Sequence, residues 1–284
     1  MDESGPLIRN VSDTALWVAV YRARETERPD AIFKDPFARR LSGERGEKIT
    51  ASISFSDKAA WAFVARTVLF DEFIDEQVRA GVDLVVNLAA GLDTRPYRMT
   101  LPPSLTWVEV DLPGILDYKE GILHGEKPVC ALERVRLDLA DVAGRRALFE
   151  RLGRSARRAL ILCEGLLIYL DAEEVGSLAR DLAVPASFRS WVLDLASPGL
   201  LKIILKDSGT QLSSAGAALK FAPAEGPAFF GPHGWKPVDV RSPLKTAARL
   251  HRLSFGMRLL SMLPESSGPQ GKRPWSGVCL FEKD

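Results

Sequence analysis

The sequence predicts an α/β fold built on a doubly wound, seven-stranded and mostly parallel sheet, with a helical N-terminal cap and a helical insertion after the fifth strand. From residue 82 onward, short apolar runs that end in Gly, Asp or Glu alternate with helical stretches. This alternation is typical of a parallel sheet that is covered on both faces. Before and after that zone, apolar residues recur at helical spacing. Right-handed crossovers between the strands would place helices on both faces of the sheet.

The composition is that of a globular protein. The chain has 284 residues, of which 46% are hydrophobic and 26% are charged, and both fractions are near the average for globular domains. They exclude a disordered chain, a collagen and a coiled coil. The net charge of +1 creates no field that favours nucleic acid or an anionic membrane. We therefore expect neither as a partner.

The sequence shows no sign of a targeting signal, a membrane span or a metal site. Asp2 and Glu3 stand where a signal peptide needs lysines. No uncharged apolar run approaches the roughly 18–20 residues that a bilayer span requires. The three cysteines lack metal-ligand spacing, and such a sparse, odd number is typical of a reducing compartment. We expect a soluble, cytoplasmic protein without a bound metal.

The first half of the predicted single domain, residues 1–284, comprises the cap and the core. Residues 1–80 form the helical cap, with helical spacing in residues 13–22 and 59–78. Residues 81–197 form the core that would bind a cofactor. Its strands are expected at 82–88, 106–110, 134–137, 159–163 and 191–195, and its helices near 115–124, 145–152 and 173–183.

The remaining residues are expected to cover the sheet and complete it. Residues 198–235 form the insertion and lid, with helix in 198–221 and a Pro/Gly-rich stretch whose residues 222–235 could act as a gate. Residues 236–284 contribute the last strands and a helix. The expected elements there are a strand at 238–241, a helix at 244–263 and a strand at 277–282.

Small and acidic residues follow the predicted strands, where ligands bind in open α/β sheets. The first strand leads into a small-residue turn around Gly91, which allows a ligand to approach the backbone. This turn lacks the G-x-G-x-x-G pattern of a dinucleotide site. Asp111, Asp138 and Glu164 follow the next three strands. The sequence therefore favours a nucleoside ligand without a pyrophosphate.

Each acid has a functional and a structural interpretation. Asp111 follows Gly91 at about the 20-residue spacing of an acid that binds ribose hydroxyls, although it could also cap the helix that begins near Pro113. Asp138, with Leu139 beside it, could accept from an adenine amine or be a cap or surface acid. Glu164 ends a buried apolar strand, which is costly unless a cation or other donors meet it.

Together these features suit a cationic nucleoside. One small-residue turn and three carboxylates would attract an ammonium and a sulfonium but not phosphates. S-adenosyl-L-methionine has that charge pattern, whereas NAD and ATP do not.

The chain resembles the leucine carboxyl methyltransferase family, whose bacterial members are S-adenosylmethionine-dependent O-methyltransferases, some of them in polyketide and other natural-product pathways. The resemblance covers most of residues 12–240. The core motifs that carry it are the turn at residues 87–95, Glu109-Val110-Asp111-Leu112-Pro113, Asp138-Leu139 and Glu164-Gly165-Leu166-Leu167-Ile168-Tyr169-Leu170. The N-terminal motifs are Asp13-Thr14-Ala15, Tyr21-Arg22-Ala23 and Asp35-Pro36-Phe37-Ala38.

The resemblance implies a Rossmann-like class I methyltransferase fold and roles for particular residues. Arg66 would pair with the cofactor carboxylate, and the turn at Gly91 would lie against the methionine portion. Asp111 would hold the ribose, and Asp138 and Leu139 the adenine. Glu164 would hold the amino group. The implied cofactor-binding set is Arg66, Ala89, Ala90, Gly91, Asp93, Asp111, Leu112, Asp138, Leu139, Glu164 and Gly165.

One position departs from the family pattern. The family usually has Leu-Gly-Ala-Gly at the turn, whereas this chain has Ala89 at the first glycine. If the position needs a positive φ, alanine costs on the order of 1 kcal/mol. If the glycine serves close approach instead, the added methyl group narrows the pocket.

The sequence favours methylation of a carboxylate over that of a hydroxyl on a small-molecule, natural-product type of acceptor. A carboxylate is ionised at neutral pH and needs no base, and no base stands out. Tyr169 and His233 are the candidate catalytic residues. Trp17, Trp61 and Trp235 could line an apolar acceptor pocket or belong to the core. The alternatives are a catalytically inactive cofactor-binding protein of the same fold and a nicotinamide-dependent oxidoreductase.

Overall fold

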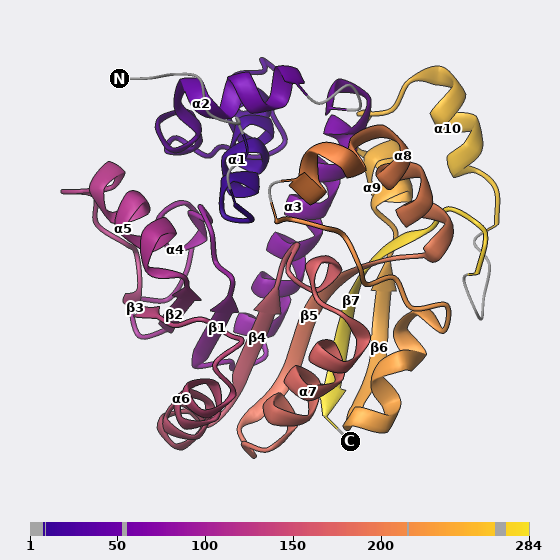
Figure 1. Cartoon of the computed structure of the whole chain (residues 1–284). Helices are drawn as coiled ribbons and strands as arrows, with labels where there is room; N and C mark the ends of the chain where they lie inside the picture. The colour runs from indigo at the N-terminus through magenta and orange to yellow at the C-terminus, as the bar shows by residue number, and fades with distance from the viewer. Residues whose placement is uncertain (1–7, 9, 53–55, 215, 265–270, 284) are drawn as a thin grey trace.

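A single seven-stranded sheet organises the chain. The structure is a computed structural model that describes residues 8, 10–52, 56–214, 216–264 and 271–283. The strand order is β3-β2-β1-β4-β5-β7-β6, and β7 runs antiparallel to both of its neighbours, β5 and β6 (Figure 1). The strands are β1 (Leu84–Leu88), β2 (Thr106–Asp111), β3 (Ala131–Arg136), β4 (Ala159–Cys163), β5 (Phe188–Ala196), β6 (Trp235–Arg241) and β7 (Ser276–Lys283).

The predicted strands are confirmed, although β3, β5 and β6 each begin three residues earlier than predicted. The prediction placed β3 at residues 134–137, whereas it spans Ala131–Arg136. β3 is an edge strand and is partly exposed, so charged residues such as Glu133 interrupt its apolar pattern. β1 and β4 are buried along their whole length and give continuous apolar runs.

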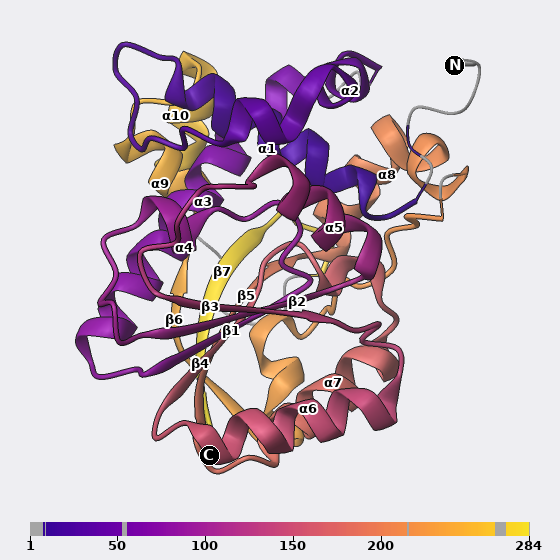
Figure 2. The same ribbon diagram turned by 90° about the vertical axis from the view of Figure 1, so that its left-hand side faces the viewer.

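Helices cover both faces of the sheet, as predicted for a doubly wound fold. Figure 2 shows α6 and α7 together on one side of the sheet and α3 on the other. The helices are α1 (Asp13–Thr26), α2 (Ala38–Ser52), α3 (Ser56–Arg79), α4 (Arg95–Arg98), α5 (Pro113–Ile122), α6 (Val142–Ser155), α7 (Ala172–Ala183), α8 (Pro198–Ser214), α9 (Pro243–Arg249) and α10 (Phe255–Ser261). The described residues also include two 3₁₀ helices, η1 (Leu167–Tyr169) and η2 (Gly226–His233).

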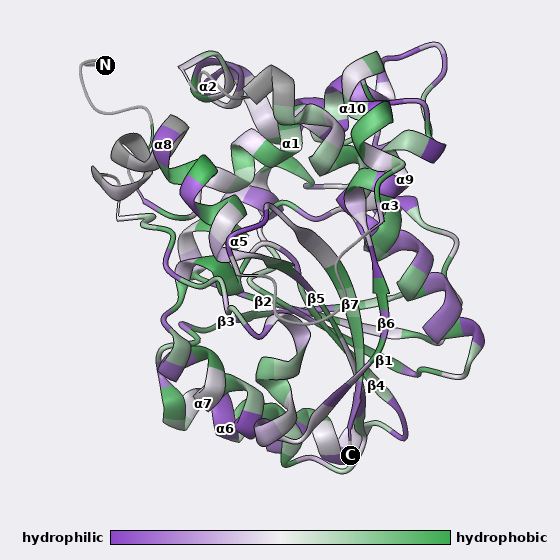
Figure 3. Cartoon of the chain, turned by 90° about the vertical axis from the view of Figure 1, so that its right-hand side faces the viewer, coloured by the Kyte–Doolittle hydropathy of each residue, from purple (hydrophilic) through white to green (hydrophobic). Residues whose placement is uncertain are grey.

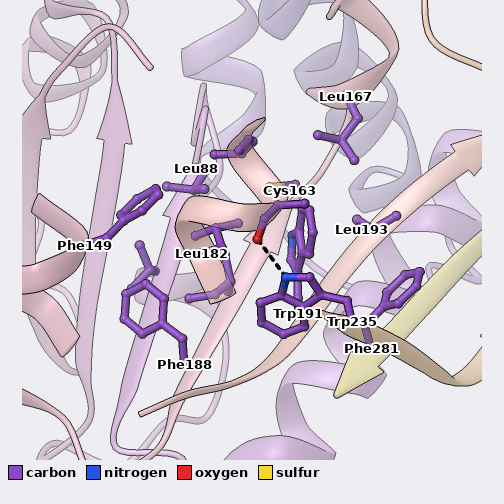
Figure 4. Close-up of a cluster of buried hydrophobic side chains, with 14 of the residues drawn as sticks. Leu88, Phe149, Cys163, Leu167, Leu182, Phe188, Trp191, Leu193, Trp235 and Phe281 are labelled. Atoms are coloured by element: carbon purple, nitrogen blue, oxygen red, sulfur yellow. Dashed lines mark hydrogen bonds between the residues drawn. The ribbon is translucent and has the colours of Figure 1, made fainter. Parts of the chain in front are cut away.

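The two faces of the sheet form separate hydrophobic clusters. On one face, Phe70 and Phe73 of α3 pack against the strands. On the other, Trp191 of β5 makes an edge contact with Trp235, with ring centroids 5.3 Å apart (Figure 4). Trp235 donates its indole N–H to the carbonyl of Ala179 at 2.9 Å, so it is a core residue. The strands between the helical layers are mainly hydrophobic, and hydrophilic residues lie mostly on the outer helices (Figure 3).

The N-terminal cap is hydrogen-bonded to the turn after β1. Arg22 of α1 donates to Asp35 at 2.8 Å and to the carbonyl oxygen of Leu92 at 2.6 Å. Thr94 donates its hydroxyl to the same Asp35 carboxylate at 2.7 Å. Arg22, Asp35 and Thr94 are all buried. These contacts fix α1 relative to the end of β1.

The prediction of one helix at residues 244–263 is wrong in one respect: the segment forms two helices, α9 and α10. His251 lies between them with φ of 55°, a left-handed conformation that ends the first helix. Apolar spacing continues across the break, which is why the sequence pattern suggests one helix.

Within the described ranges, none of the helices combines the length and apolar character needed to cross a membrane.

The contacts of Asp35 predict a stability effect. Asp35→Asn should lower the free energy of unfolding by about 3 kcal/mol, because it leaves the buried Arg22 guanidinium without its charged partner. Urea unfolding monitored by tryptophan fluorescence measures this change. The control Glu150→Gln removes an exposed ion pair with Arg154 and should leave the unfolding midpoint unchanged. Equal midpoints for Asp35→Asn and the unsubstituted protein would contradict this account of the cap.

Candidate functional site

A cavity of about 660 Å³ lies at the carboxyl ends of the parallel strands. Residues from the ends of β1, β2, β4 and β5 line it from below, and residues of α1 and α8 line it from above, in agreement with the position of these helices over the strand ends (Figure 1). The cavity brings together all the residues that the resemblance implies for cofactor binding, and Tyr169 with them. They are Arg66, Ala89, Ala90, Gly91, Asp93, Asp111, Leu112, Asp138, Leu139, Glu164 and Gly165.

The second candidate catalytic residue, His233, lies elsewhere. Its ring is at the end of η2, 3.2 Å from the guanidinium of Arg180 and close to Gly176 of α7. Burial and the positive charge of Arg180 both lower the pKa of His233. The Pro/Gly-rich segment forms a 3₁₀ helix against α7 instead of a gate over the strand ends. Its position gives no support to a catalytic role for His233.

Asp111 links the end of β2 to the turn after β1. One carboxylate oxygen accepts from the backbone N–H of Gly91 at 2.6 Å, and the other accepts from Leu112 at 2.7 Å. The N-cap residue of α5 is Leu112, so Asp111 is not the helix cap that the structural interpretation proposed. Burial raises the pKa of Asp111, and the two backbone donors oppose that rise. Each oxygen keeps a lone pair that can accept from a ligand hydroxyl.

The backbone at Ala89 decides between the two interpretations of the missing glycine. Ala89 has φ of 52°, in the left-handed region that an alanine rarely adopts. Gly91, two residues later, has φ of 49°. The position therefore requires a positive φ, and the alanine is strained there.

Glu164 is held by two arginines, as a carboxylate at the end of a buried strand requires. Arg66 of α3 donates through Nε to one Glu164 oxygen at 3.1 Å. Arg95 of α4 donates through Nη1 to the other oxygen at 2.8 Å. The Arg95 side chain is only 4% exposed and also contacts Asp93 and Asp71. A charged network thus forms part of the cavity floor.

The charges in this network set the protonation of its acids. Burial opposes ionisation of Asp93 and Asp71, but the neighbouring arginines more than compensate and lower the pKa of both carboxyl groups. Burial also opposes ionisation of Arg66, while Asp194 and Glu164 raise its pKa. Asp71, Asp93 and Arg66 are therefore charged at neutral pH.

Asp194 is a cavity residue that sequence reasoning did not single out. It lies near the end of β5, and one carboxylate oxygen accepts from the backbone N–H of Gly165 at 2.6 Å. The other oxygen accepts from Arg66 Nη1 at 3.2 Å. Its only sequence signal is an acid inside the apolar run of residues 191–195.

The upper wall of the cavity is aromatic. Trp17 and Phe63 line it, with ring centroids 5.1 Å apart. Tyr169 lies beside them, and its hydroxyl donates to that of Thr14 at 3.4 Å. Burial raises the pKa of Tyr169. Of the three tryptophans considered from the sequence, Trp17 lines the cavity, whereas Trp61 and Trp235 do not.

Comparison with known proteins identifies the family. A family model described as "Leucine carboxyl methyltransferase" matches residues 15–183. A protein of Frankia alni named "Putative S-adenosyl-L-methionine-dependent methyltransferase" is 33% identical over 263 residues, which cover 86% of this chain and 89% of that protein. A protein of Mycobacteroides abscessus with the same name is 35% identical over 216 residues, with 70% and 69% covered.

This chain belongs to the leucine carboxyl methyltransferase family.

Two solved structures share the fold of this leucine carboxyl methyltransferase family member. A duf574 family protein from Streptomyces avermitilis has a TM-score of 0.61 at 13% identity, with 94% of this chain and 97% of that chain covered. A "putative methyltransferase" from Thermobifida fusca has a TM-score of 0.59 at 16% identity, with 100% and 97% covered. The Rossmann-like class I methyltransferase fold implied by the resemblance is confirmed.

The strained turn of this family member predicts a stabilising substitution. Ala89→Gly should raise the free energy of unfolding by about 0.5–1 kcal/mol, because removing the left-handed penalty of alanine outweighs the greater chain entropy of glycine. Denaturant unfolding gives the difference. Ala90→Gly is the matched control: its φ is not positive, so it should destabilise the fold by a similar amount. Destabilisation by both substitutions would show that position 89 is not strained.

Proposed function

We propose that this protein is an S-adenosyl-L-methionine-dependent O-methyltransferase whose acceptor is the carboxylate of a small molecule of the natural-product type. Membership of the leucine carboxyl methyltransferase family supports the cofactor and the reaction class. The observation that carries the cofactor assignment is the convergence of Asp111, Asp138 and Glu164 on one cavity beside a turn of small residues. Acids at these positions suit a nucleoside that carries an ammonium and a sulfonium, and they would repel phosphates.

The residues of the cavity have distinct binding roles in this proposal. Asp111 accepts from the ribose hydroxyls, while its contact with Gly91 keeps the turn in place. Asp138 accepts from the adenine amine, and Leu139 packs against the ring. Glu164 receives the amino group at the methionine end. The cofactor supplies a methyl group activated on a sulfonium; the protein positions the acceptor and excludes water.

The cavity favours an acceptor that is already ionised. Among the described residues that line it there is no histidine. Burial raises the pKa of Tyr169, so this phenol stays protonated at neutral pH and is not a base. A carboxylate needs no base, and transfer of a cationic methyl group to it neutralises both charges, which a dry aromatic wall favours. Trp17 and Phe63 provide that wall and suit an apolar acceptor skeleton.

In this proposal, closure over the acceptor falls to the part of the insertion at residues 198–235 that lines the cavity, and not to its Pro/Gly-rich segment. Ile204 of α8 and Leu219 line the cavity from the insertion. The N-terminal cap, in contrast, is tied to the turn after β1 through Arg22 and Asp35. We therefore assign the lid function to α8 and Leu219.

A methyl-transfer assay tests the proposed reaction. The protein is incubated with methyl-labelled S-adenosyl-L-methionine and separate pools of apolar carboxylic acids and phenols. We expect label in an ester of a carboxylic acid, and loss of at least tenfold in activity for Glu164→Gln. Label in the phenol pool alone would contradict the carboxylate assignment. Cofactor binding without transfer to any pool would favour an inactive binding protein.

The raised pKa of Asp111 predicts a pH dependence of cofactor binding. As the pH falls through that raised pKa, the carboxyl group takes up a proton and loses acceptor capacity for Gly91 and the ribose. The affinity for S-adenosylhomocysteine should therefore decrease as the buffer is acidified toward that pKa. Isothermal titration calorimetry at a series of pH values measures this effect. In Asp111→Asn the affinity should be lower, by roughly 1–3 kcal/mol, and the acid-dependent decrease should disappear; a decrease of the same size in that variant would assign it to another group.

A further inference from the structure

The ion-paired network at the cavity floor carries one more negative than positive charge. Its members are connected by ion pairs of Arg66, Arg95 and Arg98 with Asp71, Asp93, Glu164 and Asp194. Three arginines thus face four carboxylates. Removal of Asp194 would balance the network, because its one ion pair within the described part of the chain is with Arg66, which Glu164 already neutralises. A surplus charge in a largely buried cluster is costly unless a ligand compensates it.

The surplus negative charge lies at the cavity surface, because Asp194 lines the cavity. The side chain of Asp194 is 24% exposed and that of Glu164 is 17% exposed, whereas Asp71 lies outside the residues that line the cavity. Each oxygen of Asp194 and Glu164 accepts one hydrogen bond and keeps a lone pair. The two carboxylates are held on the same guanidinium, that of Arg66, and are therefore close neighbours. Their remaining lone pairs can accept hydrogen bonds from one small cation.

The backbone at Gly165 fixes this geometry. Gly165 has φ of 69°, and a Cβ atom built there would lie 3.5 Å from Arg66 Nη1 and 3.6 Å from Nη2. The guanidinium therefore lies against the glycine while the glycine N–H binds Asp194. Arg66 Nη2 makes no hydrogen bond to another described residue, so it can donate to a ligand carboxylate. The three residues together offer two acceptors and one donor, which match an α-amino acid.

We propose that Asp194 and Glu164 jointly bind the α-ammonium group of the cofactor, with Asp194 as the residue that supplies the uncompensated charge. This inference rests on the proposed function, and it adds a second acid to the amino-group role that the resemblance gives to Glu164 alone. The α-ammonium lies against the surplus negative charge of Asp194 and Glu164, and Arg66 Nη2 takes the adjacent carboxylate. Because these two ligand charges cancel, the sulfonium of the cofactor supplies the positive charge that balances the network. Asp194 is thus a specificity residue for the amino-acid end of the ligand.

A comparison of two ligands across one substitution tests the inference. The ligands are S-adenosylhomocysteine and an analogue that lacks only the α-amino group, and the protein variant is Asp194→Asn, whose side-chain oxygen can still accept from Gly165. Calorimetry gives the four dissociation constants. We expect the unsubstituted protein to prefer the amino-bearing ligand, and Asp194→Asn to reduce that preference at least tenfold with little change for the analogue. Thermal melting confirms that the variant is folded.

The matched control is Asp239→Asn. Asp239 lies on β6 and pairs with Arg241, but it does not line the cavity. This variant should keep the full preference for the amino-bearing ligand. Equal losses of affinity for both ligands in Asp194→Asn, or no loss for either, would overturn the inference. Neither result would contradict the proposed function, because the unsubstituted protein would still bind the cofactor. If the unsubstituted protein bound neither ligand, the proposed function itself would fail.

Discussion

The need to neutralise a carboxylate at the end of a buried strand governs the architecture of the site. Glu164 follows β4, which is buried along its whole length, and a charge there requires cationic partners from outside the sheet. α3 provides Arg66 and α4 provides Arg95. Asp194 binds Arg66, and Asp71 and Asp93 bind Arg95. The positions of α3 and α4 are therefore coupled to each other. The ion pairs therefore fix the positions of α3 and α4 relative to the end of β4, which packing alone would not fix.

A second set of polar contacts makes the turn after β1 a shared structural element. Asp111 binds the backbone of Gly91 from below, and Arg22 binds the carbonyl of Leu92 from above. The turn is thus fixed by one strand and one helix of the cap. This explains how the chain tolerates the unfavourable backbone of Ala89, since the surrounding hydrogen bonds determine the conformation of the turn.

Most of the fold and the location of the site could be predicted from the sequence. The same physical reasons explain which features could not be predicted. Fully buried strands such as β4 give uninterrupted apolar runs, and the ends of parallel strands meet at one edge, so acids distant in sequence were expected to converge. Asp194 was missed because it lies within an apolar run. The pairing of Arg95 with Glu164 couples residues distant in sequence, which local patterns do not encode. The break at His251 left the apolar spacing intact, so two helices appeared as one.

The antiparallel strand inside the sheet has a consequence for how this protein folds. β7 separates β5 from β6, and its register joins Ser190 to Glu282 on one side and Trp235 to Lys283 on the other. β5 can therefore acquire its second neighbour only after a segment distant in sequence has returned, and such high contact order slows folding. Until then β5 presents an unpaired edge, a source of intermolecular association during folding. Asp194, which lines the ligand cavity, thus lies on a strand whose second neighbour comes from a segment distant in sequence.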